Sequence, residues 1–277
     1  MLHRYKAALL TAAIFTGGCA SKALDQAYLP NNNQYRATVV TTPDFDIQTV
    51  QPTAHTADVL RVYIEGDGRA WATSRTASTD PTPTQSLMLQ YQQSDATPSV
   101  YMARVCQFVQ SDSCNKQVWT DQRFSGAVIQ SHSHALDQLK TKYGNQQFEL
   151  VGYSGGAAVA LLLAAGRDDI AQVQTIAGNL DHAAWTTTLK IRPLEGSLNP
   201  SDYALELRQI PQRLIMGMND PIIPSEVLQA YTKSVQPACA EVHVVPADHW
   251  EGFDEVWDEV KDVPVECLAQ SSSTSTR

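Results

Sequence analysis

The order of apolar and polar positions along the chain predicts an α/β fold, a mostly parallel central sheet with helices on both faces. Residues 58–65 form a β-branched apolar run that ends at Gly66, which is typical of a buried strand. Residues 124–142 carry apolar side chains at helical spacing, and Gly144 predicts the end of that helix. From residue 148 to residue 260, strand and helix patterns take turns, as in a parallel sheet with helical crossovers. The expected strands are 36–40 and 45–50, an antiparallel pair at one edge, then 58–65, 99–105, 148–153, 173–177, 213–217 and 241–245; the expected helices are 86–93, 124–142, 155–165, 225–234 and 252–260.

One connection between the expected strands is longer than the others. Residues 178–211 precede the strand 213–217, and their length indicates a short insertion that shapes a substrate pocket. His182 lies in this insertion and is a candidate for contact with substrate, while Ser225 is placed to cap the helix that follows the strand. The insertion holds a moderate number of large apolar side chains, which favours a small pocket over a broad lid. These side chains are Trp185, Leu189, Leu194 and Leu198.

The start of the chain has the layout of an export signal. A basic segment with Arg4 and Lys6 precedes the apolar run 7–15, and small residues then lead to Cys19. The apolar run is too short for a membrane-spanning helix, which needs about 20 residues. We therefore expect residues 1–18 to be a signal peptide. An ordinary signal peptide cleaved nearby, with no role for the cysteine, is the alternative.

The position of this cysteine resembles the lipobox of bacterial lipoproteins, with Thr16 in place of the usual Leu. The resemblance implies a mature chain that begins at a lipidated Cys19 and is anchored in a lipid bilayer. Ala20 after the cysteine implies sorting to the outer membrane, on its periplasmic side, over retention at the inner membrane. The chain is then expected to comprise a signal peptide (1–18), a tether (19–35), one folded domain (36–268) and a disordered tail (269–277).

The other cysteines indicate the redox state of the compartment, and the net charge limits the kinds of partner. Four cysteines remain, and they allow three pairings. We favour Cys106–Cys114, which closes a short loop, and Cys239–Cys267, which would pin the last helix to the last strand; four free thiols are less expected outside the cytoplasm. No cysteine or histidine spacing predicts a metal site. The net charge of -9 argues against a nucleic-acid partner.

The first candidate for a reactive site is a pentapeptide that matches the pattern Gly-x-Ser-x-Gly, namely Gly152-Tyr153-Ser154-Gly155-Gly156. It follows an expected strand and opens an expected helix, so a sharp turn would lift the serine hydroxyl above the edge of the sheet. Small neighbours let the helix pack closely and leave the N–H after the serine free to donate. An unreactive glycine-rich turn would share these features, so the assignment of Ser154 as a nucleophile depends on its partners.

A serine hydroxyl becomes a nucleophile when a base removes its proton, and the base needs an orienting carboxylate. Asp220 follows the next-to-last expected strand, and His249 follows the last one. With Ser154 they stand in the order serine, acid, histidine, each after its own strand. Asp181 and Asp248 are rival acids, Asp181 because it follows the strand before the insertion. We favour Asp220 because of its position in that order.

These residues together resemble the α/β-hydrolase superfamily, over a stretch from about Asp58 to about Val260. The whole combination resembles a group of poorly characterised bacterial α/β-hydrolase lipoproteins. The resemblance implies the α/β-hydrolase fold and hydrolysis of an acyl bond through an acyl-enzyme, with no cofactor. The segments that carry the narrower resemblance are Tyr63-Ile64-Glu65-Gly66-Asp67-Gly68, Arg104-Val105-Cys106-Gln107, Trp119-Thr120-Asp121-Gln122-Arg123-Phe124 and Ala177-Gly178-Asn179-Leu180-Asp181.

Acyl transfer also requires an oxyanion hole, two N–H donors for the charge that develops on the carbonyl oxygen. The N–H of Gly155, directly after the serine, is the first donor. The segment Glu65-Gly66-Asp67-Gly68 stands where many relatives carry His-Gly-x-Gly, and this resemblance implies the Asp67 N–H as the second donor. The Asp67 carboxylate must then point away from the oxyanion. An ordinary glycine turn is the alternative.

The sequence therefore predicts an exported serine hydrolase that acts on a small-molecule or acyl substrate, with carboxylic esters as the first choice. Amides or peptides are the alternative substrates for the same site. A second class of function is a non-catalytic envelope lipoprotein that keeps the fold as a binding module. Loss of a catalytic residue would mark that class, and Ser154, Asp220 and His249 are all present.

Overall fold

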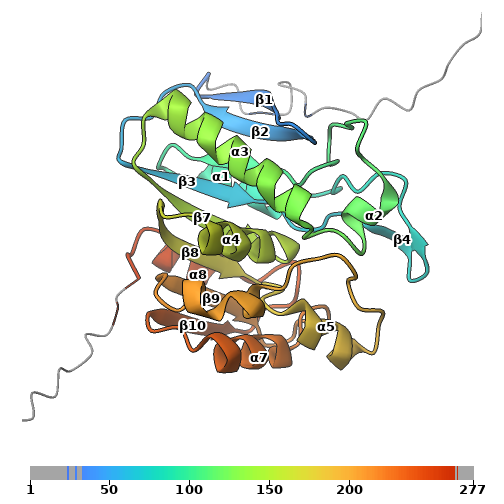
Figure 1. Ribbon diagram of the computed structural model, residues 1–277. Coiled ribbons are helices and arrows are strands. Elements are labelled where there is room, and N and C mark those ends of the chain that lie inside the picture. Colours follow the sequence, from blue (N-terminus) through green and yellow to red (C-terminus); the bar gives the residue numbers. More distant parts are fainter. Residues whose placement is uncertain (1–23, 25–28, 30–32, 266, 268–277) are drawn as a thin grey trace, which may run out of the picture.

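An eight-stranded sheet runs through the molecule, with helices on both of its faces (Figure 1). The computed structural model describes residues 24, 29, 33–265 and 267. The predicted signal peptide, the lipidation site Cys19 and the predicted tail 269–277 lie outside the described residues. Within the predicted tether, Leu29 is buried against the domain, and the first strand begins at Tyr35.

The sheet has the strand order β1-β2-β6-β3-β7-β8-β9-β10. β1 pairs antiparallel with β2, and β2 pairs antiparallel with β6, whereas the strands from β6 to β10 are parallel to their neighbours. The antiparallel edge and the parallel remainder confirm the sheet that the sequence predicts. The strands are β1 (Tyr35–Thr41), β2 (Asp46–Pro52), β3 (Val59–Ile64), β6 (Val100–Met102), β7 (Gln147–Tyr153), β8 (Ile170–Ile176), β9 (Gln212–Gly217) and β10 (Ala240–Val245).

The register of the parallel strands brings their carboxyl ends to one edge of the sheet. Ile64 at the end of β3 lies opposite Gly152 in β7, and Tyr153 lies opposite Ile176 at the end of β8. Val245 at the end of β10 lies opposite Gly217 at the end of β9. The loops that follow these strands therefore meet along the same edge, which is where doubly covered parallel sheets bind ligands.

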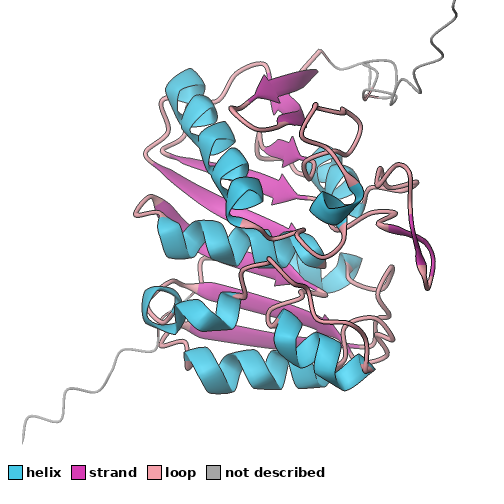
Figure 2. Ribbon diagram, turned by 45° about the vertical axis from the view of Figure 1, so that its right-hand side comes forward, coloured by secondary structure: helices cyan, strands magenta, loops and turns pink. Residues whose placement is uncertain are grey.

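Two layers of helices cover the sheet, as Figures 1 and 2 show. α3, α4 and α7 pack on one face in the larger apolar core, and α1 and α8 contribute to a second core on the other face. Alternate side chains of β3 enter opposite cores, Val62 the first and Tyr63 the second, as the period of two in a strand requires. The helices are α1 (Leu87–Ser94), α2 (Lys116–Trp119), α3 (Gly126–Tyr143), α4 (Gly155–Gly166), α5 (His182–Leu189), α6 (Ala204–Leu207), α7 (Ser225–Val235) and α8 (Asp254–Val260).

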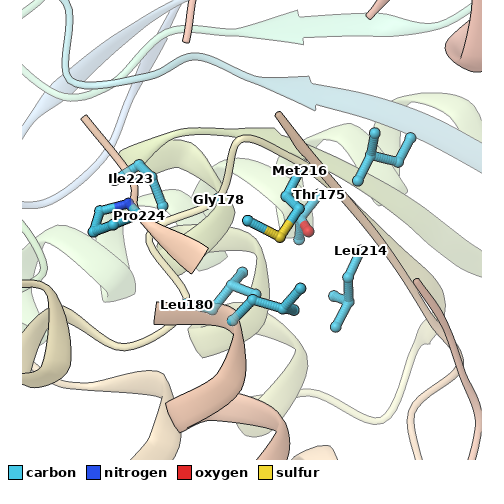
Figure 3. A pocket seen from close by; sticks show the side chains of 9 residues that line it. Thr175, Gly178, Leu180, Leu214, Met216, Ile223 and Pro224 are labelled. Atoms are coloured by element: carbon cyan, nitrogen blue, oxygen red, sulfur yellow. The ribbon is translucent and has the colours of Figure 1, made fainter. Parts of the chain in front are cut away.

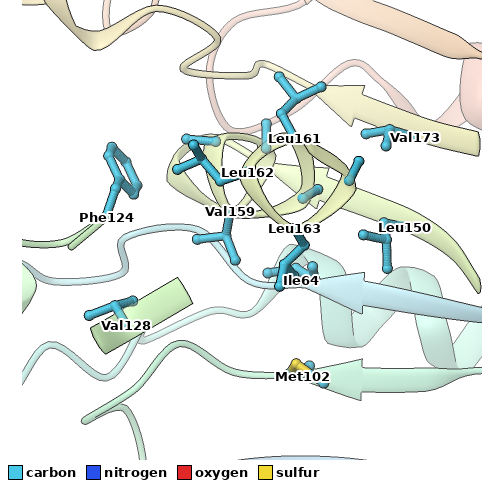
Figure 4. Packing of buried hydrophobic residues seen from close by; sticks show 14 of the residues in the cluster. Ile64, Met102, Phe124, Val128, Leu150, Val159, Leu161, Leu162, Leu163 and Val173 are labelled. Carbon is cyan, nitrogen blue, oxygen red and sulfur yellow. The ribbon is translucent and has the colours of Figure 1, made fainter. Parts of the chain in front are cut away.

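The helix after the serine, α4, is buried on every side from Gly155 to Ala164. Its Val159, Leu161, Leu162 and Leu163 pack among side chains of β3, β7 and β8 (Figure 4). An uninterrupted run of small and aliphatic residues suits this position, since a helix that is apolar all round is stable only inside a core. The serine turn is therefore anchored on the most deeply buried helix of the described chain.

Several predicted boundaries are wrong, and the backbone shows why. The strand expected at 99–105 ends at Met102, because the chain then enters a tight loop in which Cys106 and Phe108 have positive φ. The helix expected from residue 252 begins at Asp254, since Gly252 has a φ of 96°. The cap expected at Ser225 is also wrong: Pro224 holds the cap position and Ser225 is the first helical residue.

The sequence patterns missed several short elements. A hairpin of β4 (Trp71–Thr73) and β5 (Thr76–Ala77) follows the loop after β3. The insertion holds α5, a 3-10 helix at Pro200–Tyr203, and α6. Each element is only two to eight residues long, too short to give a clear period.

The four cysteines of the domain lie in the two pairs that the sequence favours. The Cα atoms of Cys106 and Cys114 are 5.7 Å apart, and those of Cys239 and Cys267 are 4.5 Å apart, with disulfide bonds between them. The first bond closes the loop after β6, and the second joins the residue before β10 to the segment after α8. Across the described residues, no helix combines the length and the apolar character needed to cross a bilayer.

Candidate active site

The serine of the pentapeptide sits at the sharp turn between β7 and α4. Ser154 has a φ of 52° and a ψ of -119°, a conformation that costs a non-glycine residue about 1–3 kcal/mol. Hydrogen bonds hold it there: its N–H donates to the Ile176 carbonyl at 3.0 Å, and its own carbonyl accepts from the N–H groups of Asn179 and Ala157. The residue is buried apart from 8% of its surface.

The two glycines of the motif are required by close packing at this turn. A Cβ at Gly152 would lie 2.5 Å from the carbonyl oxygen of Gly156, and a Cβ at Gly156 would lie 2.4 Å from that of Ile64. Either methyl group would push α4 away from β7 or β3. The Gly-x-Ser-x-Gly pattern is thus explained by the approach of the helix to the sheet.

Three side chains from three loops form a hydrogen-bonded chain at the edge of the sheet. The Oγ of Ser154 lies 3.1 Å from Nε2 of His249, and Nδ1 of His249 lies 2.8 Å from Oδ2 of Asp220. The side chains of His249 and Asp220 are 7% and 1% exposed. With Nδ1–H directed at the carboxylate, Nε2 carries the lone pair that can accept the serine proton.

Further contacts fix the orientation of the acid and of the imidazole. The other carboxylate oxygen of Asp220 accepts hydrogen bonds from the N–H groups of Ile222 and Ile223 at 2.7 and 2.8 Å. The Tyr153 hydroxyl donates to the carbonyl of His249 at 2.8 Å, and the two rings lie 5.2 Å apart. The residue between Gly152 and Ser154 in the motif therefore also supports the histidine.

The two rival acids are engaged elsewhere. Asp181 caps α5, since it accepts a hydrogen bond from Ala184 N–H, and it also accepts from the side chains of Asn199 and Ser201. Asp248 accepts from the backbone N–H groups of the two residues that follow His249. Of the carboxylates in the described part of the chain, Asp220 is the one that pairs with the His249 ring.

A pocket of about 440 Å³ opens above Ser154 and His249. Its apolar wall contains three tryptophans, Trp71, Trp185 and Trp250, which come from the β4–β5 hairpin, from α5 and from the loop after His249. The indole N–H of Trp185 donates to the Ile222 carbonyl at 2.7 Å, so the insertion is tied to the loop that carries Asp220. The volume and the aromatic lining are typical of a site for a small ligand.

The predicted contribution of the insertion to this pocket is correct only in part. Trp185 lines the pocket, but Leu194 and Leu198 pack on the apolar core and Leu189 is 37% exposed. His182 is buried, with its ring 6.0 Å from that of Phe124, and it does not line the pocket. Trp71 escaped prediction because its hairpin has no sequence signal, whereas Trp250 stands next to His249 and could have been found.

A second, mostly apolar cavity is too small to hold a substrate. Leu214 and Met216 of β9 face Leu180, Ile223 and Pro224 across it (Figure 3). Its volume is about 10 Å³, about the space for one water molecule. It is therefore a packing gap, and the larger pocket is the candidate substrate site.

The loop after β3 reaches the serine from the neighbouring strand. The carboxylate of Asp67 is held by Nη1 of Arg104 at 3.0 Å and by Nη1 of Arg123 at 2.5 Å. Burial raises the pKa of Asp67, but the charges of Arg123 and Arg104 outweigh burial and lower it overall. The N–H groups of Asp67 and Gly155 donate no hydrogen bond to another described residue. Neither candidate donor is therefore engaged by another described residue, and Asp67 is one of the residues that line the pocket.

Glu65 begins this loop and is the most deeply buried carboxyl group at the pocket. It is 2% exposed, and one of its oxygens accepts a hydrogen bond from the N–H of Gly66 at 2.9 Å. Burial raises the pKa of Glu65 to about 7. At neutral pH the group is therefore partly protonated, which limits the negative charge beside the serine.

No protein-family model and no curated protein matches the sequence of this chain. Solved structures do match its fold. An esterase of Pyrococcus furiosus aligns with a TM-score of 0.58 and 13% identity, over 81% of this chain and 88% of the esterase. An alpha-beta serine hydrolase homologue from Coxiella burnetii aligns at 0.52 and 15% identity, over 87% of this chain and 100% of the homologue. The acylaminoacyl peptidase of Pyrococcus horikoshii aligns at 0.51 and 14% identity, over 79% of this chain and 37% of the peptidase. The chain has the α/β-hydrolase fold.

Proposed function

We propose that this chain is an exported serine hydrolase that cleaves carboxylic esters through an acyl-enzyme on Ser154. One observation carries the proposal: the Ser154 hydroxyl, the His249 imidazole and the Asp220 carboxylate form one hydrogen-bonded chain that opens into the 440 Å³ pocket. The matching structures include an esterase, a serine hydrolase homologue and a peptidase, so the fold is compatible with this chemistry.

The proposed reaction has two steps. Oγ of Ser154 attacks the ester carbonyl carbon while Nε2 of His249 takes the hydroxyl proton, and the N–H groups of Gly155 and Asp67 receive the oxyanion. The tetrahedral intermediate collapses, His249 gives its proton to the leaving alcohol oxygen, and the acyl group stays on Ser154. Water then attacks the acyl carbon with His249 as base, which releases a carboxylic acid and restores the serine. Asp220 holds the imidazole throughout.

The pocket wall supports an apolar substrate of small to medium size. Three tryptophans and the side chains of Ile222 and Ile223 offer apolar surface, and a volume of about 440 Å³ is in the range of sites for small ligands. The same nucleophile and base also cleave amides, the bond class named for the matching peptidase. Ester and amide substrates therefore belong in one test.

We also propose that the chain is exported and held at the outer membrane through a lipid on Cys19. The apolar run before Cys19 supports export, and the disulfides Cys106–Cys114 and Cys239–Cys267 support an oxidising compartment. Palmitate incorporation that disappears in Cys19→Ser, and processing that stops with a signal-peptidase II inhibitor, are the expected results. Release of a soluble chain without lipid would contradict the anchor.

The activity is tested with a panel of esters of graded acyl length beside aminoacyl amides, on the purified mature chain. We expect hydrolysis of short and medium acyl esters, with the activity lost in Ser154→Ala. Faster turnover of the amides would redirect the proposal to a peptidase or amidase. Turnover of no substrate, together with tight binding of one of them, would favour a binding module instead.

A further inference from the structure

We infer that Gln107, together with Arg104 and Arg123, positions the Asp67 N–H as an oxyanion donor. The inference deepens the proposed function and rests on it. Gln107 and Arg104 come from the loop after β6, and Arg123 from the segment before α3, so none of them belongs to the serine, acid or histidine loops. All three are buried, with exposures of 1%, 5% and 4%.

The first argument is the orientation of a single peptide group. Nε2 of Gln107 donates a hydrogen bond to the carbonyl oxygen of Gly66 at 3.0 Å. In a trans peptide the next N–H points opposite to that carbonyl, so this bond turns the Asp67 N–H away from Gln107. Gln107 lines a separate cavity of about 10 Å³ and not the substrate pocket. The amide of Gln107 is itself fixed, because its Oε1 accepts from the Arg104 N–H at 3.1 Å.

The second argument is that two arginines fix the position of the Asp67 carboxylate. Arg104 and Arg123 each donate to one oxygen of the Asp67 carboxylate, and Arg104 also donates to the Arg123 carbonyl at 2.5 Å. The carboxylate packs directly on the backbone of Gly155, where an added Cβ would lie 2.0 Å from Asp67 Oδ1. Asp67, which carries one donor, is thus in direct contact with Gly155, which carries the other. The two arginines also offset a negative charge that would otherwise oppose the oxyanion.

The third argument is the strain in the backbone on either side of Gln107. Cys106 has a φ of 67° and Phe108 a φ of 63°, and both side chains are buried. Such conformations in non-glycine residues are uncommon and persist when the surroundings enforce them, often at functional sites. The disulfide to Cys114 and a hydrogen bond from Phe108 N–H to Thr82 Oγ1 at 2.7 Å supply that enforcement. The strained loop therefore places the Gln107 amide within hydrogen-bond distance of the Gly66 carbonyl.

The test uses Gln107→Glu, which keeps the shape and the acceptor for Arg104 but replaces the donor to Gly66 with an oxygen. Gln212→Glu is the matched control, because Gln212 is equally buried and its Nε2 also donates to a backbone carbonyl, that of Leu207, at 2.7 Å. Gln212 begins β9, at the opposite end of that strand from the Asp220 loop. Gln107→Met, which removes both hydrogen bonds without a charge, is the second test variant.

Each variant is titrated with a fluorophosphonate, so that kcat is expressed per reactive serine. We expect Gln107→Glu and Gln107→Met to lower kcat about 10- to 100-fold, less than the 10²–10³ lost with a whole oxyanion donor, with KM changed less than about 2-fold. Binding of a trifluoromethyl ketone should weaken by the same factor as kcat. Gln212→Glu should keep the wild-type kcat per reactive serine.

Wild-type kcat per reactive serine in whichever Gln107 variant folds would overturn the inference, as would a loss shared equally by Gln212→Glu. A rise in KM at constant kcat would also overturn it, because it would place Gln107 in ground-state binding. A wild-type chain that the fluorophosphonate does not label would refute the proposed function itself, and this inference with it. The two failures are therefore distinguishable.

Discussion

The strained backbone conformation of Ser154 predicts the relative stability of two variants at this position. At a φ of 52° and a ψ of -119°, a side chain with a Cβ carries about 1–3 kcal/mol of strain that glycine avoids. Glycine in turn costs about 0.5–1 kcal/mol because it gives the unfolded chain more freedom. Ser154→Gly should therefore be more stable than Ser154→Ala, by up to about 2.5 kcal/mol. Both variants lack the hydroxyl and should be inactive, so activity does not confound the comparison.

The assay is urea unfolding of both variants, followed by tryptophan fluorescence with the disulfides kept oxidised. Ser154→Ala is the control, since it removes Oγ and retains the Cβ that is strained. For a domain of this size, the difference corresponds to up to roughly 10 °C in melting temperature. A glycine variant that is less stable than the alanine variant, as at an ordinary backbone position, would refute the strained turn.

Three further predictions concern charge and cross-links. The folded-state pKa of Glu65, about 7, lies above its usual 4.5. The protonated group therefore favours the folded state below pH 4.5, and the free energy of unfolding falls as the pH rises from 4.5 through 7. Glu65→Gln should remove this pH dependence and raise the free energy of unfolding at pH 8 by up to about 3 kcal/mol, measured by urea unfolding; equal stability of both chains at pH 8 would contradict it. Asp220→Asn should lower kcat by about 10⁴-fold, and Asp181→Asn should leave kcat within about 10-fold of wild type; the reverse order would make Asp181 the acid. Cys106→Ser with Cys114→Ser should cost about 2–3 kcal/mol of stability, and an unchanged urea midpoint would argue against a stabilising disulfide.

The sheet was predictable from the sequence because each long element carries its own period. The buried runs of β3 and β7 and the long stripe of α3 each give a clear signal, and Gly144 ends α3 at a φ of 71° as expected. The order of Ser154, Asp220 and His249 along the chain also identified the three side chains that the structure brings together. These predictions depend on local pattern and on chain order, both of which a sequence contains.

The pocket wall was not predictable in the same way. The β4–β5 hairpin and α5 are too short to show a period, so the position of Trp71 was missed. The role of Gln107 depends on a hydrogen bond to Gly66, 41 residues away, and on a strained loop that no local propensity favours. Arg104 and Arg123 belong to two of the segments that carry the family resemblance, but their shared partner Asp67 is evident only in three dimensions.

The most direct test of the central claim is to find which residue a fluorophosphonate modifies on the purified mature chain. We predict a single adduct on the peptide that contains Ser154, absent from Ser154→Ala and formed several orders of magnitude more slowly in His249→Ala. Peptide mass mapping locates the adduct, and the folded state of each variant is checked by its unfolding curve. Equal labelling of wild type and Ser154→Ala, or an adduct on another residue, would contradict the assignment of Ser154 as the nucleophile.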